Sequence, residues 1–186
     1  MKLAKIYTND FNRLIATTKA FVANDTYRSW MKYIKLEFHA SENQVVAMAT
    51  DGCRMSVEHS IISNCTEDFA VYIKGNVSLP KKQYATIELS DDGKEAIVRC
   101  KEFSFGYEQP KVEEFDWKKV IPTNEVKYRI GFNGNFLLSA LQAAKISAGN
   151  SFREPVILEF RSNDEPILLR TNKEDIKMVL PVRVKR

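Results

Sequence analysis

Hydrophobic and polar residues alternate along much of this chain, which is the pattern of β-strands with one buried face. Residues 45–57 show it on both sides of an Asp-Gly pair, which predicts two strands joined as a hairpin. Further strands are predicted at 2–7, 31–40, 69–73, 84–89, 95–100, 102–107, 128–132, 155–160, 167–170 and 177–184.

Two other stretches repeat their apolar residues at helical spacing. The first places Phe11, Leu14 and Ile15 on one face, behind a cap at Asn9 or Asp10. The second begins after a cap at Asn133 or Asn135, and its apolar side consists of Leu137, Leu138, Leu141 and Ala144.

The predicted elements follow in the order β-α-β-β, a β-rich segment without a helix, and then β-α-β-β-β. Gly75 and Pro80 disfavour a helix in the middle segment. The two helical units read as weak internal repeats. Few helices and many antiparallel strands predict an α+β fold with helices packed on one face of the sheets. The irregular stretch 110–122 is charged and aromatic, which is typical of a connector between two structural units.

The hairpin at 45–57 suggests a first candidate site. Asp51-Gly52 tolerates the positive φ of a type I′ turn. Arg54 would lie near the tip, within reach of a carboxylate or a backbone carbonyl, while Met55 faces the opposite side and offers a soft apolar contact. The turn signals alone favour the alternative, an ordinary hairpin with a solvated Arg54.

Composition limits the class of protein. The chain has 186 residues, 44% hydrophobic and 28% charged, as in a soluble globular protein with one large domain or two small ones. It contains no apolar run that could span a bilayer and no signal peptide, so we expect a cytoplasmic protein without a membrane partner. Three cysteines without C-x-x-C spacing favour a reducing compartment and no zinc site. The net charge of +4 permits an anionic partner.

Candidate catalytic residues are few. His39 and His59 lie in predicted strands without a nearby nucleophile, and the carboxylate pairs at 91–92 and 113–114 lie in predicted turns, where they are typically solvated. With 7 glycines and no Gly-rich run between a strand and a helix, the chain has no phosphate-binding loop. We therefore expect no catalytic residue, no metal and no cofactor.

Three segments, taken in order, carry a resemblance to a known family. Residues 49–55 read Ala-Thr-Asp-Gly-Cys-Arg-Met, residues 115–122 read Phe-Asp-Trp-Lys-Lys-Val-Ile-Pro, and residues 178–184 read Met-Val-Leu-Pro-Val-Arg-Val. Together they resemble the bacterial sliding clamp, the β subunit of DNA polymerase III, from about residue 11 onward. The helix after Asn133 and the following Phe152-Arg153 are similar to the last domain of that family. The family's hairpin typically has His and Leu at the positions of Cys53 and Met55.

The resemblance implies a fold, two kinds of partner and a set of site residues. Clamps are rings of repeated units whose helices line a hole around DNA and whose sheets lie outside. Peptides with apolar anchors dock between their second and third domains, in a pocket with aliphatic walls and flanking arginines. The matching pocket residues of this chain are Thr50, Gly52, Arg54, Met55, Pro122, Val179, Leu180, Pro181, Val182 and Arg183.

DNA contact would involve the polar faces of the two helices. Arg13, Lys19 and Lys145 lie on those faces and would neutralise phosphates without reading bases. An ordinary solvated helix face explains the same three cations equally well.

The domain expectation combines these patterns. Residues 1–122 would form one clamp-type domain whose second unit lacks its helix, and residues 123–186 a further half-domain packed against it. The expected function is that of a processivity factor, a homo-oligomer that binds double-stranded DNA non-specifically and docks DNA polymerase and other clamp-binding peptides. The alternative is a clamp-like peptide-binding module that does not encircle DNA. An enzyme is a distant third reading.

Overall fold

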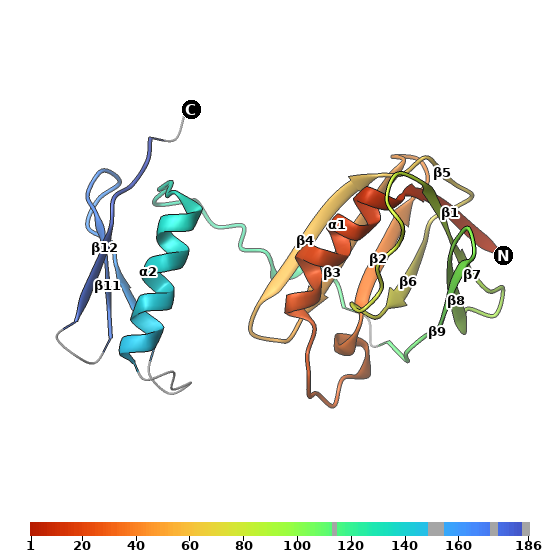
Figure 1. The fold of residues 1–186 in the computed structure, drawn as a ribbon, viewed down its shortest axis with the longest axis horizontal. Coiled ribbons are helices and arrows are strands. Elements are labelled where there is room, and N and C mark those ends of the chain that lie inside the picture. The colour runs from red at the N-terminus through yellow and green to blue at the C-terminus, as the bar shows by residue number, and fades with distance from the viewer. Residues whose placement is uncertain (113–114, 149–154, 172–174, 184–186) are drawn as a thin grey trace. The chain divides into compact units, whose positions relative to one another are not determined.

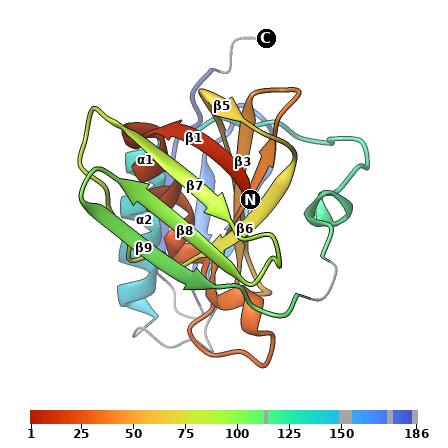
Figure 2. The same cartoon turned by 90° about the vertical axis from the view of Figure 1, so that its right-hand side faces the viewer.

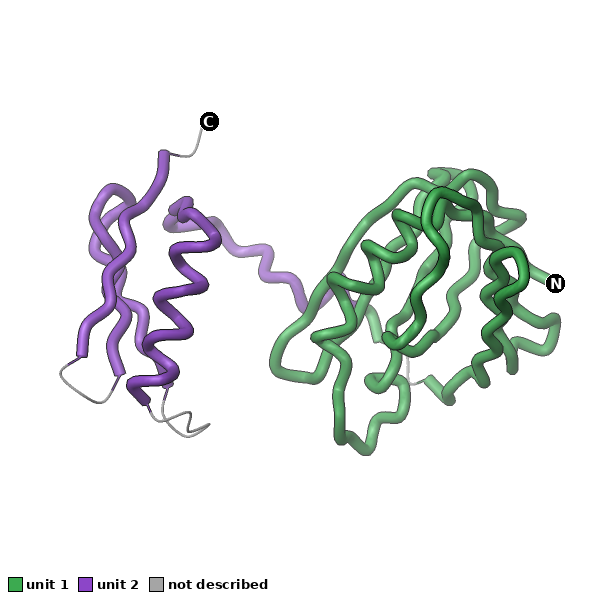
Figure 3. The backbone as a smooth tube through the Cα atoms, viewed as in Figure 1, with its two compact units in different colours: residues 1–116 green, residues 117–186 purple. Residues whose placement is uncertain are grey.

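The protein folds into two compact units, residues 1–116 and 117–186, each described here by itself (Figure 3). The structure is a computed structural model that describes residues 1–112, 115–148, 155–171 and 175–183. Some residues of the sequence predictions lie outside the described part, namely Glu113, Glu114, Phe152, Arg153 and Val184.

Unit 1 contains two antiparallel sheets and one α-helix, α1 (Thr8–Thr18) (Figure 1). The first sheet has the strand order β5-β1-β7-β8-β9, formed by Asn64–Cys65, Lys2–Tyr7, Tyr84–Leu89, Glu95–Cys100 and Phe103–Glu108. The second sheet has the order β4-β3-β2-β6, formed by Met55–Ile61, Gln44–Thr50, Ile34–His39 and Phe69–Ile73. Two short 3-10 segments, Lys19–Phe21 and Ser29–Lys32, follow α1.

The two halves of unit 1 exchange strands. β1, which precedes α1, pairs with β7 of the second half from Lys2↔Leu89 to Tyr7↔Tyr84, and Figure 2 shows it beside β7, β8 and β9. β6, which belongs to the second half, pairs with β2 of the first half from Ile34↔Ile73 to Phe38↔Phe69. Each sheet therefore takes one strand from the other half of the chain.

The core of unit 1 accounts for the alternation of hydrophobic and polar residues in the sequence. The apolar positions of β2, Ile34, Leu36 and Phe38, are buried while the residues between them are partly exposed. Phe11 and Leu14 of α1 are also buried, and the helix packs against β1, β3 and β4. Burial of these faces supplies the main driving force for folding of the unit.

The second half of unit 1 has no helix between its strands. Residues 74–83 form turns and extended backbone, as Gly75 and Pro80 indicated. Val77 and Leu79 of this loop are buried in the common core. The Asn12 side chain donates to the carbonyl of Leu79 at 2.8 Å and accepts from its N–H at 2.9 Å, so α1 holds the loop directly.

Unit 2 contains helix α2 (Gly134–Ser147) and a three-stranded antiparallel sheet, β10-β11-β12. The strands are Ile157–Glu159, Ile167–Arg170 and Ile176–Val179. The Asn133 side chain accepts hydrogen bonds from the N–H groups of Asn135 and Phe136, which confirms it as the helix cap. A small core of Ile167, Leu169 and Val179 packs against residues of α2.

The predicted α+β fold with antiparallel sheets is confirmed, since every described strand pair is antiparallel. The predicted strand at 128–132 is wrong, because this segment makes a single bridge, between Gly131 and Val182. The last strand ends at Val179 rather than at 184, because Pro181 has no N–H to continue a ladder.

The start of α1 also differs from the prediction. The residue before the helix is Tyr7, whose side chain makes no capping bond. Asn9 instead accepts a hydrogen bond from the N–H of Lys82 in the 74–83 loop, so its polar group stabilises the loop rather than the helix end.

Candidate functional site

The hairpin between β3 and β4 is closed by a loop of four residues, not two. The last strand pair is Thr50↔Met55. Gly52 has φ +91°, but Asp51 is not among the described residues with positive φ, so the predicted type I′ turn is wrong. The Asp51 side chain accounts for the difference, because one of its oxygens accepts from the N–H groups of Cys53 and Arg54 at 3.0 Å each.

Thr50 strengthens the same loop from the strand end. Its hydroxyl donates to the Arg54 carbonyl at 2.9 Å and accepts from the Gly52 N–H at 3.1 Å. Thr50 is buried and Met55 half-buried, whereas Gly52 and Arg54 are exposed. The hairpin tip is therefore a hydrogen-bonded loop that holds Arg54 at the surface.

Arg54 makes two contacts at this tip. Its Nε lies 2.8 Å from an Asp51 carboxylate oxygen, which confirms the predicted reach to a carboxylate. Its guanidinium carbon lies 5.3 Å from the centre of the Phe21 ring, within the range of a cation–π contact. The hydrogen bond from Arg54 is the main cause of the lowered pKa of Asp51, so this carboxylate is ionised at neutral pH. Because the Arg54 side chain is 59% exposed, it can still meet a ligand.

The remaining candidate pocket residues belong to unit 2. Val179 is buried at the end of β12, opposite Ile167. Leu180 and Val182 are exposed at 65% and 48%, and the N–H of Val182 donates to Gly131 at 2.8 Å. Pro122 and Arg183 are exposed, and Pro181 is half-buried.

The sequence prediction thus divides between the two units. Thr50, Gly52, Arg54 and Met55 lie in unit 1, and Pro122 with 179–183 lies in unit 2. Their assembly into one pocket stays a prediction.

The three candidate DNA-binding cations have different surroundings. Arg13 donates to Glu58 at 3.2 Å and to the His59 carbonyl at 2.8 Å, so it ties α1 to β4. Lys19 lies just beyond α1, in the 3-10 segment, and Lys145 is exposed in the last turn of α2. Lys19 and Lys145 therefore remain the stronger candidates for contact with phosphates.

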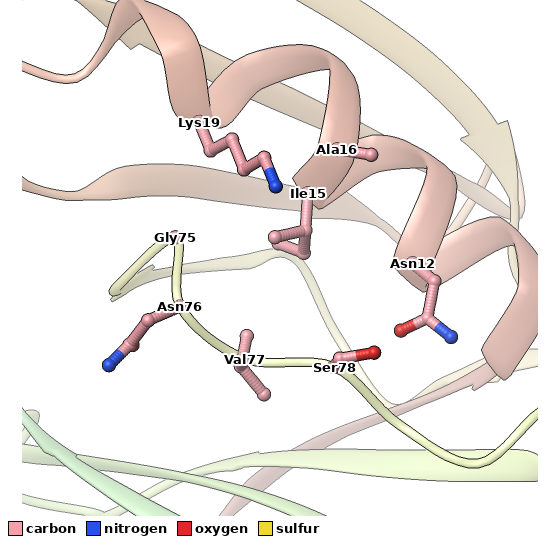
Figure 4. A pocket seen from close by; sticks show the side chains of 8 residues that line it. All are labelled: Asn12, Ile15, Ala16, Lys19, Gly75, Asn76, Val77 and Ser78. Atoms are coloured by element: carbon pink, nitrogen blue, oxygen red, sulfur yellow. The ribbon is translucent and has the colours of Figure 1, made fainter.

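Lys19 also borders a cavity of about 190 Å³ between α1 and the 74–83 loop. Figure 4 shows Asn12, Ile15 and Lys19 on the helix side and Gly75 and Ser78 on the loop side. The sequence predictions did not include this cavity. Asn12 appeared to belong to the polar face of the helix, and nothing in the local pattern showed that its amide would bind a loop 67 residues away.

Gly75 allows the loop to approach the helix closely. A Cβ placed on Gly75 would lie 2.8 Å from the Cβ of Lys19, nearer than real Cβ contacts come. Close packing of the loop against the helix side therefore requires a residue without a side chain at this position.

Neither unit provides a metal-binding cluster in its described residues. No group of three or more His, Cys, Asp or Glu side chains in that part of the chain could hold a metal ion. Its cysteines are free, with Cys53 exposed and Cys100 buried. The helices in the same part are too short or too polar to cross a membrane.

Neither a protein-family model nor a curated protein sequence matches the chain. Solved structures do match it. The β chain of DNA polymerase III from Streptococcus pneumoniae superposes with a TM-score of 0.82 over 98% of this chain, at 15% identity. The fold is that of a sliding clamp.

Two other clamps support the same conclusion about the fold. The β subunit from the DNA polymerase of Streptococcus pyogenes matches 96% of this chain with a TM-score of 0.81 and 19% identity. The Helicobacter pylori β clamp, solved with a DNA ligase peptide, matches 100% of it with a TM-score of 0.75 and 11% identity. This chain spans 50% to 52% of the length of these clamps.

Proposed function

We propose that this protein is a non-catalytic sliding-clamp-type processivity factor. In this proposal it binds double-stranded DNA without reading the sequence and docks peptides of DNA polymerase and other replication proteins. The observation that carries the proposal is the clamp fold over 98% of the chain, together with three clamp-like segments in the clamp order. Residues 1–116 then correspond to a clamp-type domain with one helix missing, and residues 117–186 to a half-domain.

The surface chemistry of both sets of pocket residues suits a peptide with apolar anchors. Leu180 and Val182 expose aliphatic side chains, and Met55 adds a flexible thioether that adapts to different anchors. Arg54 provides a cation for a carboxylate or a backbone carbonyl. A fully buried Leu or Phe anchor contributes roughly 1.5–3 kcal/mol, so two anchors with a few hydrogen bonds give about micromolar affinity.

A peptide titration tests the docking proposal. A Gln-x-x-Leu-Phe peptide should bind the wild-type protein with a Kd of about micromolar and bind Met55→Asp at least about tenfold more weakly, because the aspartate would be desolvated against an apolar anchor. The matched control is Ile61→Asp at the other end of β4, where the side chain is 79% exposed. Equal affinity for Met55→Asp and wild type, or no binding to folded wild type, would refute the docking proposal.

A second titration tests the DNA proposal. Lys19→Glu with Lys145→Glu should weaken retention equally on unrelated duplexes, with the largest loss at low salt, because phosphate contacts are screened by salt. Lys94→Glu in the β7–β8 turn is the control, since Lys94 is 82% exposed and lies outside both helices. If the double variant and wild type bind DNA alike, Lys19 and Lys145 do not contact phosphates. That result would contradict the proposal that the protein encircles DNA.

The alternative is a clamp-like peptide-binding module that does not surround DNA. Retention on closed circular DNA compared with linear DNA separates the two, because a closed ring slides off ends and stays on circles. Equal retention on circular and linear DNA, with peptide binding intact, would support the peptide-binding module over the DNA-encircling clamp.

A further inference from the structure

The cavity between α1 and the 74–83 loop has a volume of about 190 Å³ (Figure 4). It borders the loop that joins β6 to β7 without a helix. Pockets that enclose a drug-sized ligand measure roughly 300–1,000 Å³. The cavity therefore suits one small chemical group rather than a peptide or a whole nucleotide.

The charge at this cavity is positive. Among the described residues that line it, Lys19 carries the one charge, and Figure 4 shows its side chain extending from the helix into the space beside the loop. The Lys19 ammonium group makes no hydrogen bond or ion pair with the described residues. Lys74, which is exposed next to Gly75, adds a second positive charge nearby. The cavity therefore favours an anion.

The loop side of the cavity supplies neutral hydrogen-bond donors. The N–H groups of residues 75–78 make no hydrogen bond to the described residues, whereas the N–H of Leu79, the next residue, is bonded to Asn12. The hydroxyl of Ser78 makes no hydrogen bond to the described residues either. Backbone N–H groups, a hydroxyl and an ammonium group are the donors that proteins use to bind phosphate oxygens.

Packing holds these donors close to the helix. Because Gly75 has no Cβ, the loop approaches to a distance at which such an atom would lie 2.8 Å from the Cβ of Lys19. At the other end of the segment, the Asn12 side chain makes two hydrogen bonds to the backbone of Leu79. Residues 75–78 are thus fixed against α1 on both sides, so a ligand would not have to order the loop.

We propose that this cavity binds a single phosphate group, with Lys19 as the cation and Ser78 and the N–H groups of 75–78 as neutral donors. A phosphate group presents at least two oxygens that can accept from the helix side and the loop side at the same time. Inorganic phosphate, a phosphate monoester and the DNA backbone all offer this chemistry. The site goes beyond the proposed function, because it requires neither a docked peptide nor a ring around DNA.

Amide NMR of the full chain with inorganic phosphate tests the proposal. At an ionic strength kept constant with sodium chloride, the signals of residues 75–78 should shift and saturate, with a Kd of about 1 mM. Lys19→Gln should weaken this binding at least about tenfold, because it removes a charge-assisted hydrogen bond, and Ser78→Ala at least about threefold. Both side chains are exposed, so thermal unfolding of the two variants should match wild type.

Two control variants change similar groups outside the proposed set of donors. Lys94→Gln removes the same charge in the turn between β7 and β8. Asn76→Ala removes a polar side chain of the same loop that points away from α1 in Figure 4, and it keeps the backbone N–H. Both should bind phosphate like wild type. Signals of 75–78 that do not saturate, or equal phosphate affinity of Lys19→Gln and Lys94→Gln, would overturn the proposal.

A DNA duplex without terminal phosphates identifies the source of the group. If the duplex shifts the same signals and displaces inorganic phosphate, the DNA backbone supplies the phosphate. If inorganic phosphate and a nucleoside monophosphate bind while the duplex leaves these signals unchanged, the ligand is a free phosphate or monoester. Saturation by inorganic phosphate is measured without peptide or DNA, so failure of this site is distinguishable from failure of the clamp function.

Discussion

Asn12 provides a quantitative test of how unit 1 tolerates the missing helix. Its side chain accepts a hydrogen bond from the N–H of Leu79 at 2.9 Å and donates one to the Leu79 carbonyl at 2.8 Å. In a helix, these two backbone groups would instead bond to other backbone groups of the same helix. Leu79 is 3% exposed, so water cannot easily take over either bond. We expect Asn12→Ala to release the loop from α1.

The magnitude follows from the two bonds. An intramolecular hydrogen bond contributes about 0.5–1.5 kcal/mol net, and a buried group left without a partner costs about 1–3 kcal/mol. Because the loop can move until water reaches these two groups, each group should cost only the lower part of the range of about 1–3 kcal/mol. For the two groups together, the expected loss of unfolding free energy is about 2–3 kcal/mol. This is a large share of the roughly 5–15 kcal/mol unfolding free energy that is typical of a domain.

Urea unfolding followed by tryptophan fluorescence measures this loss in unit 1. Trp30 lies in unit 1 and Trp117 in unit 2, so a Trp117→Phe background reports on unit 1 by itself. Asn76→Ala is the matched control, because Asn76 borders the same cavity and its side chain makes no hydrogen bond to the described residues. Hydrogen exchange should show lost protection at Leu79 in Asn12→Ala and not in the control. A loss of less than about 0.5 kcal/mol would refute the claim that Asn12 holds the loop.

Two further predictions concern unit 1. Gly75→Ala should cost about 1–3 kcal/mol in urea unfolding, because the new Cβ would meet Lys19 at 2.8 Å. The control, Gly134→Ala in unit 2, has open space around the new Cβ and should cost nothing measurable. Burial, with a smaller contribution from Glu37, raises the pKa of Tyr72 to about 12 from 10.0, so unfolded chains lose this proton first. The stability that Tyr72 contributes should be intact below pH 10 and fall as the pH rises through about 12, and Tyr72→Phe should flatten that dependence in alkaline unfolding curves.

The parts of the fold that could be predicted are those fixed by local pattern. The strands at 69–73, 84–89 and 95–100 match the structure residue for residue, because alternating burial determined both the pattern and the strand. Asn133 was found as a cap because a cap acts on the two or three residues after it.

The parts that could not be predicted depend on distant partners. Asn9 resembled a cap, but its acceptor serves Lys82, 73 residues away. Asp51-Gly52 resembled a two-residue turn, but the Asp51 carboxylate draws Cys53 and Arg54 into a four-residue loop. In both cases a short polar side chain had more than one backbone group to bind, and the tertiary structure selected between them.

The candidate site depends even more on long-range contacts than the fold does. The hairpin segment fixed where Arg54 and Met55 would lie, because strand pairing is local. Whether those residues meet 179–183 depends on contacts between segments more than 120 residues apart in the sequence. Resemblance to a family can suggest such a contact, whereas hydrophobic periodicity cannot. The peptide titration therefore tests whether these residues form one docking site.

The segment 128–132 shows why a wrong strand prediction can still be informative. Its alternation is as regular as that of β1, yet β1 has β7 to pair with and this segment has one bridge. A strand requires both a suitable sequence and a free edge, and sequence pattern reports the first condition alone.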